Sequence, residues 1–220
     1  MATLIELCAG SAAVSLRWLG QRPPFGTTGG KSGFADRILA AMGLVPGGAG
    51  IGDEVVLCEP GMWGEAWALW RIPGNAAYTA EWLRSLAGEE PRALWEKLAK
   101  APVPCRPMDR LTAWAVLQYW SYGQKPVYPE GGRWRHHGFN STAPYPRIIR
   151  GAIARGQTLD VLAERLRALN LCLVRPVRRA IAEVPLCPGA RTYLDPPYAG
   201  TTPYPDGAMD LAQVADLARR

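Results

Sequence analysis

The chain has 220 residues, of which 48% are hydrophobic and 20% charged, so it can bury a substantial core and is not disordered throughout. Its formal net charge is +6, and the stretch from Lys125 to Arg191 carries 12 Lys or Arg against 4 Asp or Glu. This local excess of positive charge favours a phosphate-bearing partner, although a solvated basic face with no partner also fits.

The five cysteines are scattered and form no C-x-x-C pair, which argues against a zinc ribbon or a disulfide framework and favours reduced thiols. The adjacent His136 and His137 have no evident third ligand, so we expect no metal site. The first residues, MATLIELCAG, lack the basic segment of a secretory signal, and no apolar run reaches the roughly 20 residues that cross a bilayer. We therefore expect a cytoplasmic protein without a membrane-spanning segment.

Strands and helices alternate along the chain. Short apolar or β-branched segments predict strands at 3–7, 54–60, 171–176 and 191–194. Within 8–20, small residues predict a tight turn that leads into a helix, and apolar residues at helical spacing predict helical stretches at 34–44, 61–72, 79–100, 158–169 and from 210 onward. Gly43 is expected to end the second of these helices, and Thr158 or Asp160 to cap the start of the fifth. The alternation predicts an α/β fold with a doubly wound, mostly parallel sheet.

Two stretches in the middle of the chain are less clear. The apolar segment 111–120 is compatible with either a helix or a buried strand. The segment 121–147 is long and rich in Gly, Pro, Arg and aromatic residues, so we expect a functional excursion rather than a simple connection.

Two motifs follow predicted strands. CAGSAA comes directly after the first strand, and DPPY directly after the last. Ligands of open α/β sheets collect outside the carboxyl ends of the strands, so the two motifs would face one crevice if their strands are neighbours. Small residues in CAGSAA allow a sharp turn and close approach of a ligand, although packing of a helix on the sheet explains them equally well.

The DPPY motif is more specific. Each proline fixes φ and removes an N–H donor, so Asp195 and the backbone carbonyls beside it present acceptors without donors. Such an array suits an amino group, and Tyr198 adds a face on which a planar ring can stack. A purely structural Asp-Pro turn is the alternative.

LDPPY together with ELCAGSAAVSL resembles the amino-group DNA methyltransferases, specifically the Dam-like adenine-N6 class of phage type. TTGGKSGFADRIL is similar to the family's Gly-Gly-Lys cofactor motif, an acidic residue closes VVLCEP, and GTTPY follows DPPY as in the family. LQYWSYGQKPV and RWRHHGF are similar to segments of phage-type members. The resemblance implies a Rossmann-like, S-adenosylmethionine-dependent methyltransferase fold with an inserted DNA-recognition segment.

The resemblance also implies roles for segments and residues. Residues 1–100 and 158–220 would form the catalytic domain that binds S-adenosylmethionine, and residues 101–157 the inserted target-recognition segment. The implied catalytic motif is Asp195, Pro196, Pro197 and Tyr198. The residues expected to bind S-adenosylmethionine are Glu6, Cys8, Ala9, Gly10, Ser11, Ala12, Gly30, Lys31, Glu59 and Asp195. The basic and aromatic residues expected to contact double-stranded DNA are Tyr122, Lys125, Arg133, Trp134, Arg135, Arg147 and Arg150.

The implied activity is transfer of a methyl group to adenine N6 in DNA, with the target base flipped out of the duplex into the DPPY pocket. It would place the protein in the cytosol of a bacterium or of a phage-infected host, where a restriction-modification role is one possibility. A cytosine-N4 or RNA amino-methyltransferase stays an alternative, as does a degenerate nucleic-acid-binding subunit that needs a partner.

The sequence departs from the family pattern in three places. The family loop is Phe-x-Gly-x-Gly, whereas Cys8 and Ala12 stand at the outer positions here. The Gly-Gly-Lys element follows the first strand instead of preceding it. The chain stops one helix after DPPY, which predicts a fold shortened at the C-terminus, or a sheet edge that a protein partner or a second copy completes.

Overall fold

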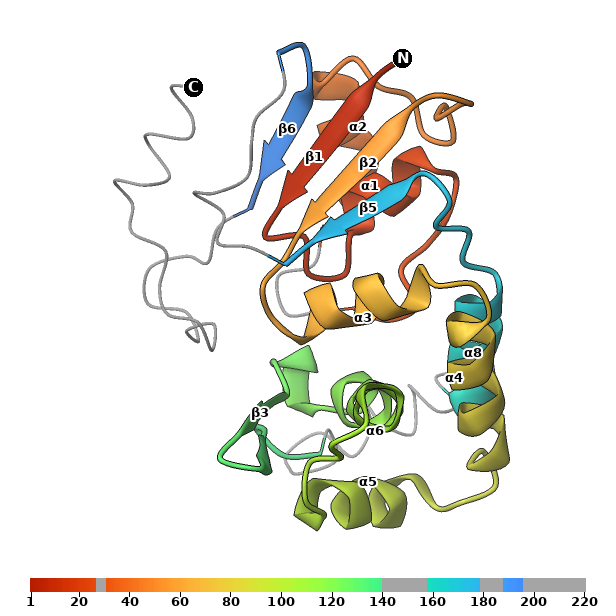
Figure 1. Cartoon of the computed structure of the whole chain (residues 1–220), viewed down its shortest axis with the longest axis vertical. Helices are drawn as coiled ribbons and strands as arrows, with labels where there is room; N and C mark the ends of the chain where they lie inside the picture. Colours follow the sequence, from red (N-terminus) through yellow and green to blue (C-terminus); the bar gives the residue numbers. More distant parts are fainter. Residues whose placement is uncertain (27–30, 140–157, 179–187, 196–220) are drawn as a thin grey trace. The chain divides into compact units, whose positions relative to one another are not determined.

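The structure, a computed structural model, describes residues 1–26, 31–139, 158–178 and 188–195 (Figure 1). These residues form two compact units. The first contains residues 1–23, 31–71 and the described residues from 170 onward. The second contains residues 24–26, 72–139 and 158–169.

The first unit is an α/β unit with a four-stranded parallel sheet. Its strands are β1 (Thr3–Leu7), β2 (Glu54–Cys58), β5 (Val174–Val177) and β6 (Arg191–Leu194). Its helices are α1 (Ala13–Trp18), α2 (Ala35–Ala41) and α3 (Met62–Trp70). The strand order is β5-β2-β1-β6, and each neighbouring pair is parallel. All four predicted strands and the first three predicted helices are thereby confirmed.

Alternation along β1 and β2 separates two apolar faces of the sheet. Ile5 and Leu7 lie on one face with Val56 and Cys58, and all four are buried. Glu6 lies on the other face, because its carboxylate accepts a hydrogen bond from α1. In Figure 1, α1 and α2 lie behind the sheet, and α3 crosses beyond the carboxyl ends of β2 and β5. The first unit is therefore a parallel sheet flanked by helices.

The second unit is mainly helical. Its helices are α4 (Asn75–Ser85), α5 (Pro91–Lys100), α6 (Pro107–Tyr119), α8 (Leu159–Arg167) and the 3-10 helix η1 (Tyr122–Gln124). A short hairpin joins β3 (Tyr128–Glu130) to β4 (Arg133–Arg135). Gly131 and Gly132 form its two-residue turn and both have positive φ, a conformation that glycine adopts without steric cost.

The second unit includes more of the chain than the predicted segment 101–157. It also contains α4, α5 and α8, because α4 packs against both α8 and α6 while α5 packs against α6 and β4. The compact units therefore differ from the predicted segment boundaries. The roles assigned to those segments stay predictions.

Helix α6 resolves the ambiguous apolar segment at 111–120. Every residue from Leu111 to Tyr119 is buried, so other elements surround this part of the helix on all sides, which explains why most of its residues are apolar. Side chains of α6 also hold the chain that follows it. Gln118 Oε1 accepts the Val127 N–H at 2.9 Å, and the Trp114 indole donates to the Val127 carbonyl at 2.9 Å.

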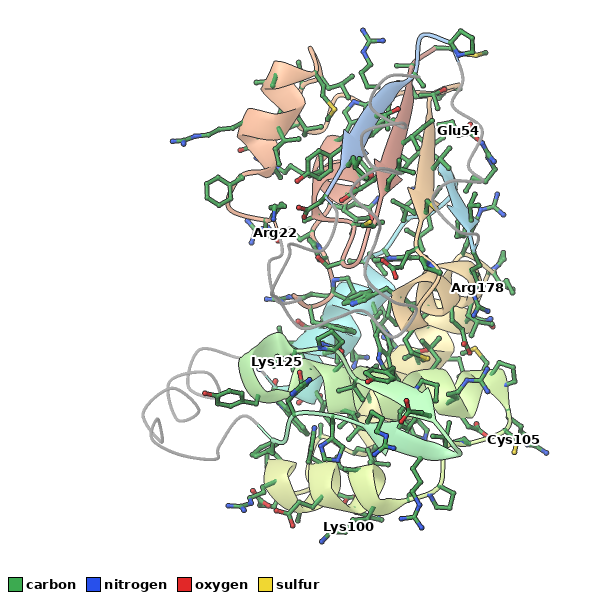
Figure 2. The ribbon with its side chains drawn as sticks, turned by 90° about the vertical axis from the view of Figure 1, so that its left-hand side faces the viewer. Arg22, Glu54, Lys100, Cys105, Lys125 and Arg178 are labelled. Carbon is green, nitrogen blue, oxygen red and sulfur yellow. The ribbon has the colours of Figure 1, made fainter. Side chains whose placement is uncertain are left out.

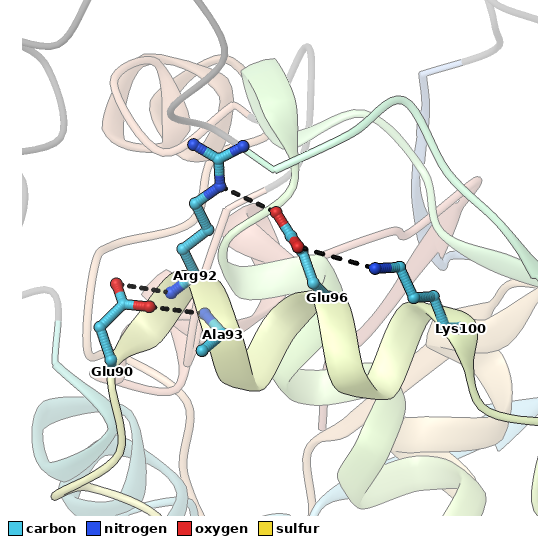
Figure 3. Close-up of polar contacts among 5 residues, drawn as sticks. All are labelled: Glu90, Arg92, Ala93, Glu96 and Lys100. Atoms are coloured by element: carbon cyan, nitrogen blue, oxygen red, sulfur yellow. Dashed lines mark hydrogen bonds and ion pairs between the residues drawn. The ribbon is translucent and has the colours of Figure 1, made fainter.

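The stretch 79–100 is largely helical, as predicted, but the end of α4 and the whole of α5 share it, with a break between Ser85 and Pro91. Glu90 caps the start of α5, where its carboxylate accepts the N–H groups of Arg92 at 3.0 Å and Ala93 at 2.6 Å (Figure 3). Pro91 occupies the first position of α5, where no helical hydrogen bond from its missing N–H is needed. A proline in the interior of a longer helix would break it, so a helix cannot continue through residue 91. The cap and the proline together explain the break before residue 91. Thr158 caps α8 as predicted, accepting the Val161 N–H at 3.4 Å.

Candidate functional site

The carboxyl ends of the four parallel strands lie level with one another. Leu7 pairs with Cys58 on one side and with Leu194 on the other, and Cys58 pairs with Val177. The residues that follow these strands are Cys8, Glu59, Arg178 and Asp195. The Asp195 N–H donates to the Leu7 carbonyl at 3.5 Å, which continues the β1–β6 pairing by one step. The CAGSAA and DPPY motifs thus begin directly after two neighbouring strands, which is the condition on which a shared crevice depends.

The loop after β1 turns sharply. Cys8, Gly10 and Ala12 have φ values of 56°, 45° and 52°, all in the left-handed region. The Ala12 N–H donates to the Ala9 carbonyl at 2.6 Å, and the Ala9 N–H donates to the carbonyl of Cys58 at 3.2 Å. Left-handed conformations cost a non-glycine residue about 1–2 kcal/mol each, so contacts around the loop must stabilise them.

Gly10 is held at both of its backbone polar groups, which belong to the two peptide groups that flank its Cα. Its N–H donates to Glu59 Oε2 at 3.2 Å, and its carbonyl accepts the indole N–H of Trp67 at 2.8 Å. The other Glu59 oxygen, Oε1, accepts the Gly61 N–H at 3.1 Å. Glu59 is only 2% exposed. In this structure the acid that closes β2 therefore ties the loop after β1 to the loop before α3.

Glu6 lies beneath the first turn of α1. Its Oε2 accepts the Ser15 N–H at 2.8 Å, which satisfies one of the N–H groups that a helix N-terminus leaves without a helical partner. Glu6 is 4% exposed, and burial raises its pKa from 4.5 to about 7 despite the opposing hydrogen bonds from Ser15. In the structure, Glu6 is therefore a buried side chain that caps the N-terminus of α1. The expected contact of Glu6 with S-adenosylmethionine stays a prediction.

Cys8 and Cys58 carry thiols that stay protonated. Burial raises the pKa of each to about 12, and the nearby Glu59 carboxylate acts in the same direction on both. A thiol with so high a pKa is not a nucleophile near neutral pH. Cys8 therefore contributes a small apolar side chain and its backbone to the loop.

One residue of the Gly-Gly-Lys motif, Lys31, lies beside the first residue of the DPPY motif, Asp195. Lys31 Nζ lies 3.1 Å from Asp195 Oδ2, and the two side chains are 20% and 22% exposed. Lys31 thus reaches the end of β6 even though its motif follows β1 in the sequence. Gly30, Pro196, Pro197 and Tyr198 lie outside the described residues.

Arg178 and Glu65 extend the site beyond the sequence motifs. Arg178 follows β5, and its guanidinium lies 3.8 Å from the Glu65 carboxylate in the first turn of α3 (Figure 2). Neither residue was assigned a role from the sequence, and neither was Trp67. The only sequence signal for Trp67 is its spacing from Trp63 and Trp70, which puts the three indoles on one side of α3.

The predicted DNA-contacting residues fall in the second unit. Arg133 and Arg135 are exposed on β4, and Arg135 forms an ion pair with Glu130 across the hairpin. Lys125 and Tyr122 are half-buried beside η1, with Lys125 labelled in Figure 2. Trp134 alternates with the two arginines and is only 4% exposed, so its ring packs inside this unit. Arg147 and Arg150 lie outside the described residues.

Comparisons with known protein families and with curated proteins find no match to this chain. Within the described ranges, no helix has the length and hydrophobicity to span a membrane. Among the same residues, no three His, Cys, Asp or Glu side chains are grouped as metal ligands would be.

Proposed function

We propose that the protein is an S-adenosylmethionine-dependent methyltransferase that modifies adenine N6 in DNA. One observation carries the proposal. The glycine loop after β1, Lys31 and Asp195 occupy the same edge of one parallel sheet, with Lys31 Nζ 3.1 Å from Asp195 Oδ2. Described residues of three motifs that are separate in the sequence, and that each resemble the same family, therefore lie together where ligands of such sheets bind.

The residues around this edge suit an S-adenosylmethionine site. The loop from Cys8 to Ala12 has only small side chains and a left-handed backbone that allows close approach of a ligand, and Glu59 closes β2 beside it. When bound, S-adenosylmethionine supplies an electrophilic methyl group on its sulfonium sulfur. Besides the loop and Glu59, we assign Glu6, Gly30, Lys31 and Asp195 to this site. Glu59 would have to exchange a backbone contact to receive ribose hydroxyls, because both of its oxygens accept N–H groups here.

Asp195 is proposed to orient the target amine. The adenine amine is a weak nucleophile because its lone pair is delocalised into the ring. A carboxylate that accepts one amine N–H, with the Pro196 carbonyl accepting the other, would hold the nitrogen with its lone pair directed away from the ring plane. In this proposal Lys31, whose Nζ lies 3.1 Å from Oδ2, holds the Asp195 carboxylate in place. No covalent intermediate on the protein is needed.

The target base has to leave the duplex to reach this edge, and Tyr198 is proposed to stack on it. The exposed Arg133 and Arg135, with Lys125, are proposed to neutralise DNA phosphates. Trp134 is not part of this proposed surface because it is buried. In this proposal the first unit carries a Rossmann-like methyltransferase site and the second carries DNA recognition.

Methyl transfer from tritiated S-adenosylmethionine to unmethylated duplex DNA, followed by nucleoside analysis, tests the proposal. We expect label in N6-methyladenine, and none in DNA that is already fully methylated at the same sites. Label in N4-methylcytosine, or transfer to RNA alone, would show that the proposed substrate is wrong, while methyl transfer to an amino group would still stand. DNA binding without any transfer would refute the enzyme and leave a binding subunit.

A further inference from the structure

We propose that Trp67 is a positioning residue for the candidate cofactor site, whose indole N–H fixes the Gly10 peptide and thereby the backbone of the loop from Cys8 to Ala12. The effect on ligand affinity rests on the proposed function. The effect on the loop itself does not, because it follows from contacts within the chain.

The contact is short and fully enclosed. Trp67 Nε1 lies 2.8 Å from the Gly10 carbonyl oxygen, and the Trp67 side chain is 0% exposed. Glu59 holds the N–H of the same residue at 3.2 Å. Because its N–H and its C=O are bound from different elements, Gly10 cannot rotate either flanking peptide without losing a buried hydrogen bond. Gly10 thereby keeps the φ of 45° on which the turn depends.

The fold presents Trp67 to the loop in a preset orientation. Helix α3 starts just after Glu59, and Gly64 permits this, because a Cβ at position 64 would overlap the Glu59 carbonyl oxygen. Trp63 stacks on Trp67 with ring centroids 5.6 Å apart and planes at 22°, and Trp70 meets it edge-on at 5.5 Å. Two neighbouring indoles thus hold the Trp67 ring, and its N–H is directed at the loop without further ordering.

Loss of this donor should loosen the loop in a specific way. The Gly10 carbonyl would be buried without its partner, and the most direct relief is a rotation that brings water or another donor to it. Cys8 and Ala12 also have left-handed backbones, which non-glycine residues adopt at a cost, so they would relax toward right-handed conformations once Gly10 moves. A ligand that needs the ordered loop would then bind less tightly.

The test is Trp67→Phe, which keeps an aromatic ring and removes the N–H. We expect hydrogen exchange of the Gly10 amide to become at least tenfold faster and the Kd for S-adenosylhomocysteine, measured by calorimetry, to rise about tenfold, the size expected for one buried hydrogen bond. The matched control is Trp95→Phe. Its indole N–H also donates to a buried backbone carbonyl, that of Leu117 at 3.0 Å, but in the second unit. It should lose similar thermal stability and leave both readouts unchanged.

The two readouts separate the two proposals. Unchanged Gly10 exchange in Trp67→Phe overturns the positioning role, whatever the ligand does. Faster exchange with an unchanged Kd also overturns it as a role in the cofactor site. Absence of S-adenosylhomocysteine binding by the wild-type chain refutes the proposed function instead, while Gly10 exchange still decides the role of Trp67 in the loop. If Trp67→Phe does not fold, benzothienylalanine at position 67, which replaces the N–H by sulfur in a ring of the same shape, takes its place.

Discussion

Glu6 makes stability depend on pH in a direction opposite to that of most carboxylates. Its pKa is about 7 in the folded chain, against 4.5 for an exposed glutamate, because burial disfavours the charged form. The folded state therefore holds the Glu6 proton more tightly than the unfolded state. Its contribution to stability is fully present below pH 4.5 and is lost as the pH rises through about 7.

The size of this effect follows from the shift. Each pKa unit corresponds to about 1.4 kcal/mol, so ionising Glu6 lowers the free energy of unfolding by about 3 kcal/mol between pH 4.5 and pH 8. Glu6→Gln removes the charge but keeps an oxygen that can accept the Ser15 N–H. The variant should match the wild type near pH 4.5 and exceed its stability by about 3 kcal/mol at pH 8.

Urea unfolding of both chains at half-unit steps from pH 4.5 to 8, read as the difference in free energy between them, measures this directly. Taking the difference cancels the titration of all other groups. Glu89→Gln, which removes an exposed carboxylate, serves as the charge control. Parallel curves for wild type and Glu6→Gln would refute the reasoning, and would mean that Glu6 is hydrated or that its neighbours stabilise its charged form.

Three further predictions concern the proposed site and the packing beneath it. Asp195→Ala should abolish methyl transfer but change DNA affinity less than twofold, measured by tritium transfer and by fluorescence anisotropy. Arg133→Ala combined with Arg135→Ala should flatten the salt dependence of DNA binding, by about one unit of slope for each lost phosphate contact. Gly64→Ala should destabilise the chain by about 1–3 kcal/mol in urea unfolding, because its Cβ would overlap a backbone carbonyl, whereas Gly88→Ala, which meets nothing within 4 Å, should be nearly neutral.

Each of these has an outcome that contradicts it. Full activity of the Asp195→Ala variant would mean that the Asp195 carboxylate does not accept a hydrogen bond from the target amine during methyl transfer. An unchanged salt dependence of DNA binding in the double arginine variant would mean that Arg133 and Arg135 on β4 do not contact DNA phosphates. Equal stability of the Gly64 and Gly88 variants would mean that α3 can shift away from β2 at little cost.

The sequence by itself determined most of the local elements. Apolar runs such as TLIEL and EVVLC are short, and EVVLC is β-branched, which favours strands, and Thr158 caps α8 through a bond to a residue three positions away. The prolines of DPPY act on their own backbone, so the motif could be recognised locally. The helical character of 79–100 was predicted from the sequence, and Pro91 at the first position of α5 is a local signal for the break within it.

Only the tertiary structure decided which of these elements meet. The β5-β2-β1-β6 order makes β1 and β6 neighbours although nearly the whole chain separates them, and it brings Lys31 to Asp195. Likewise, the surroundings of the apolar segment at 111–120 made it a buried helix, and they turned Trp134 inward. Trp67 could not be identified as a site residue from the sequence, because it acts through a hydrogen bond to a backbone carbonyl. Backbone carbonyls are alike at every position, so only the fold selects Gly10 as its partner.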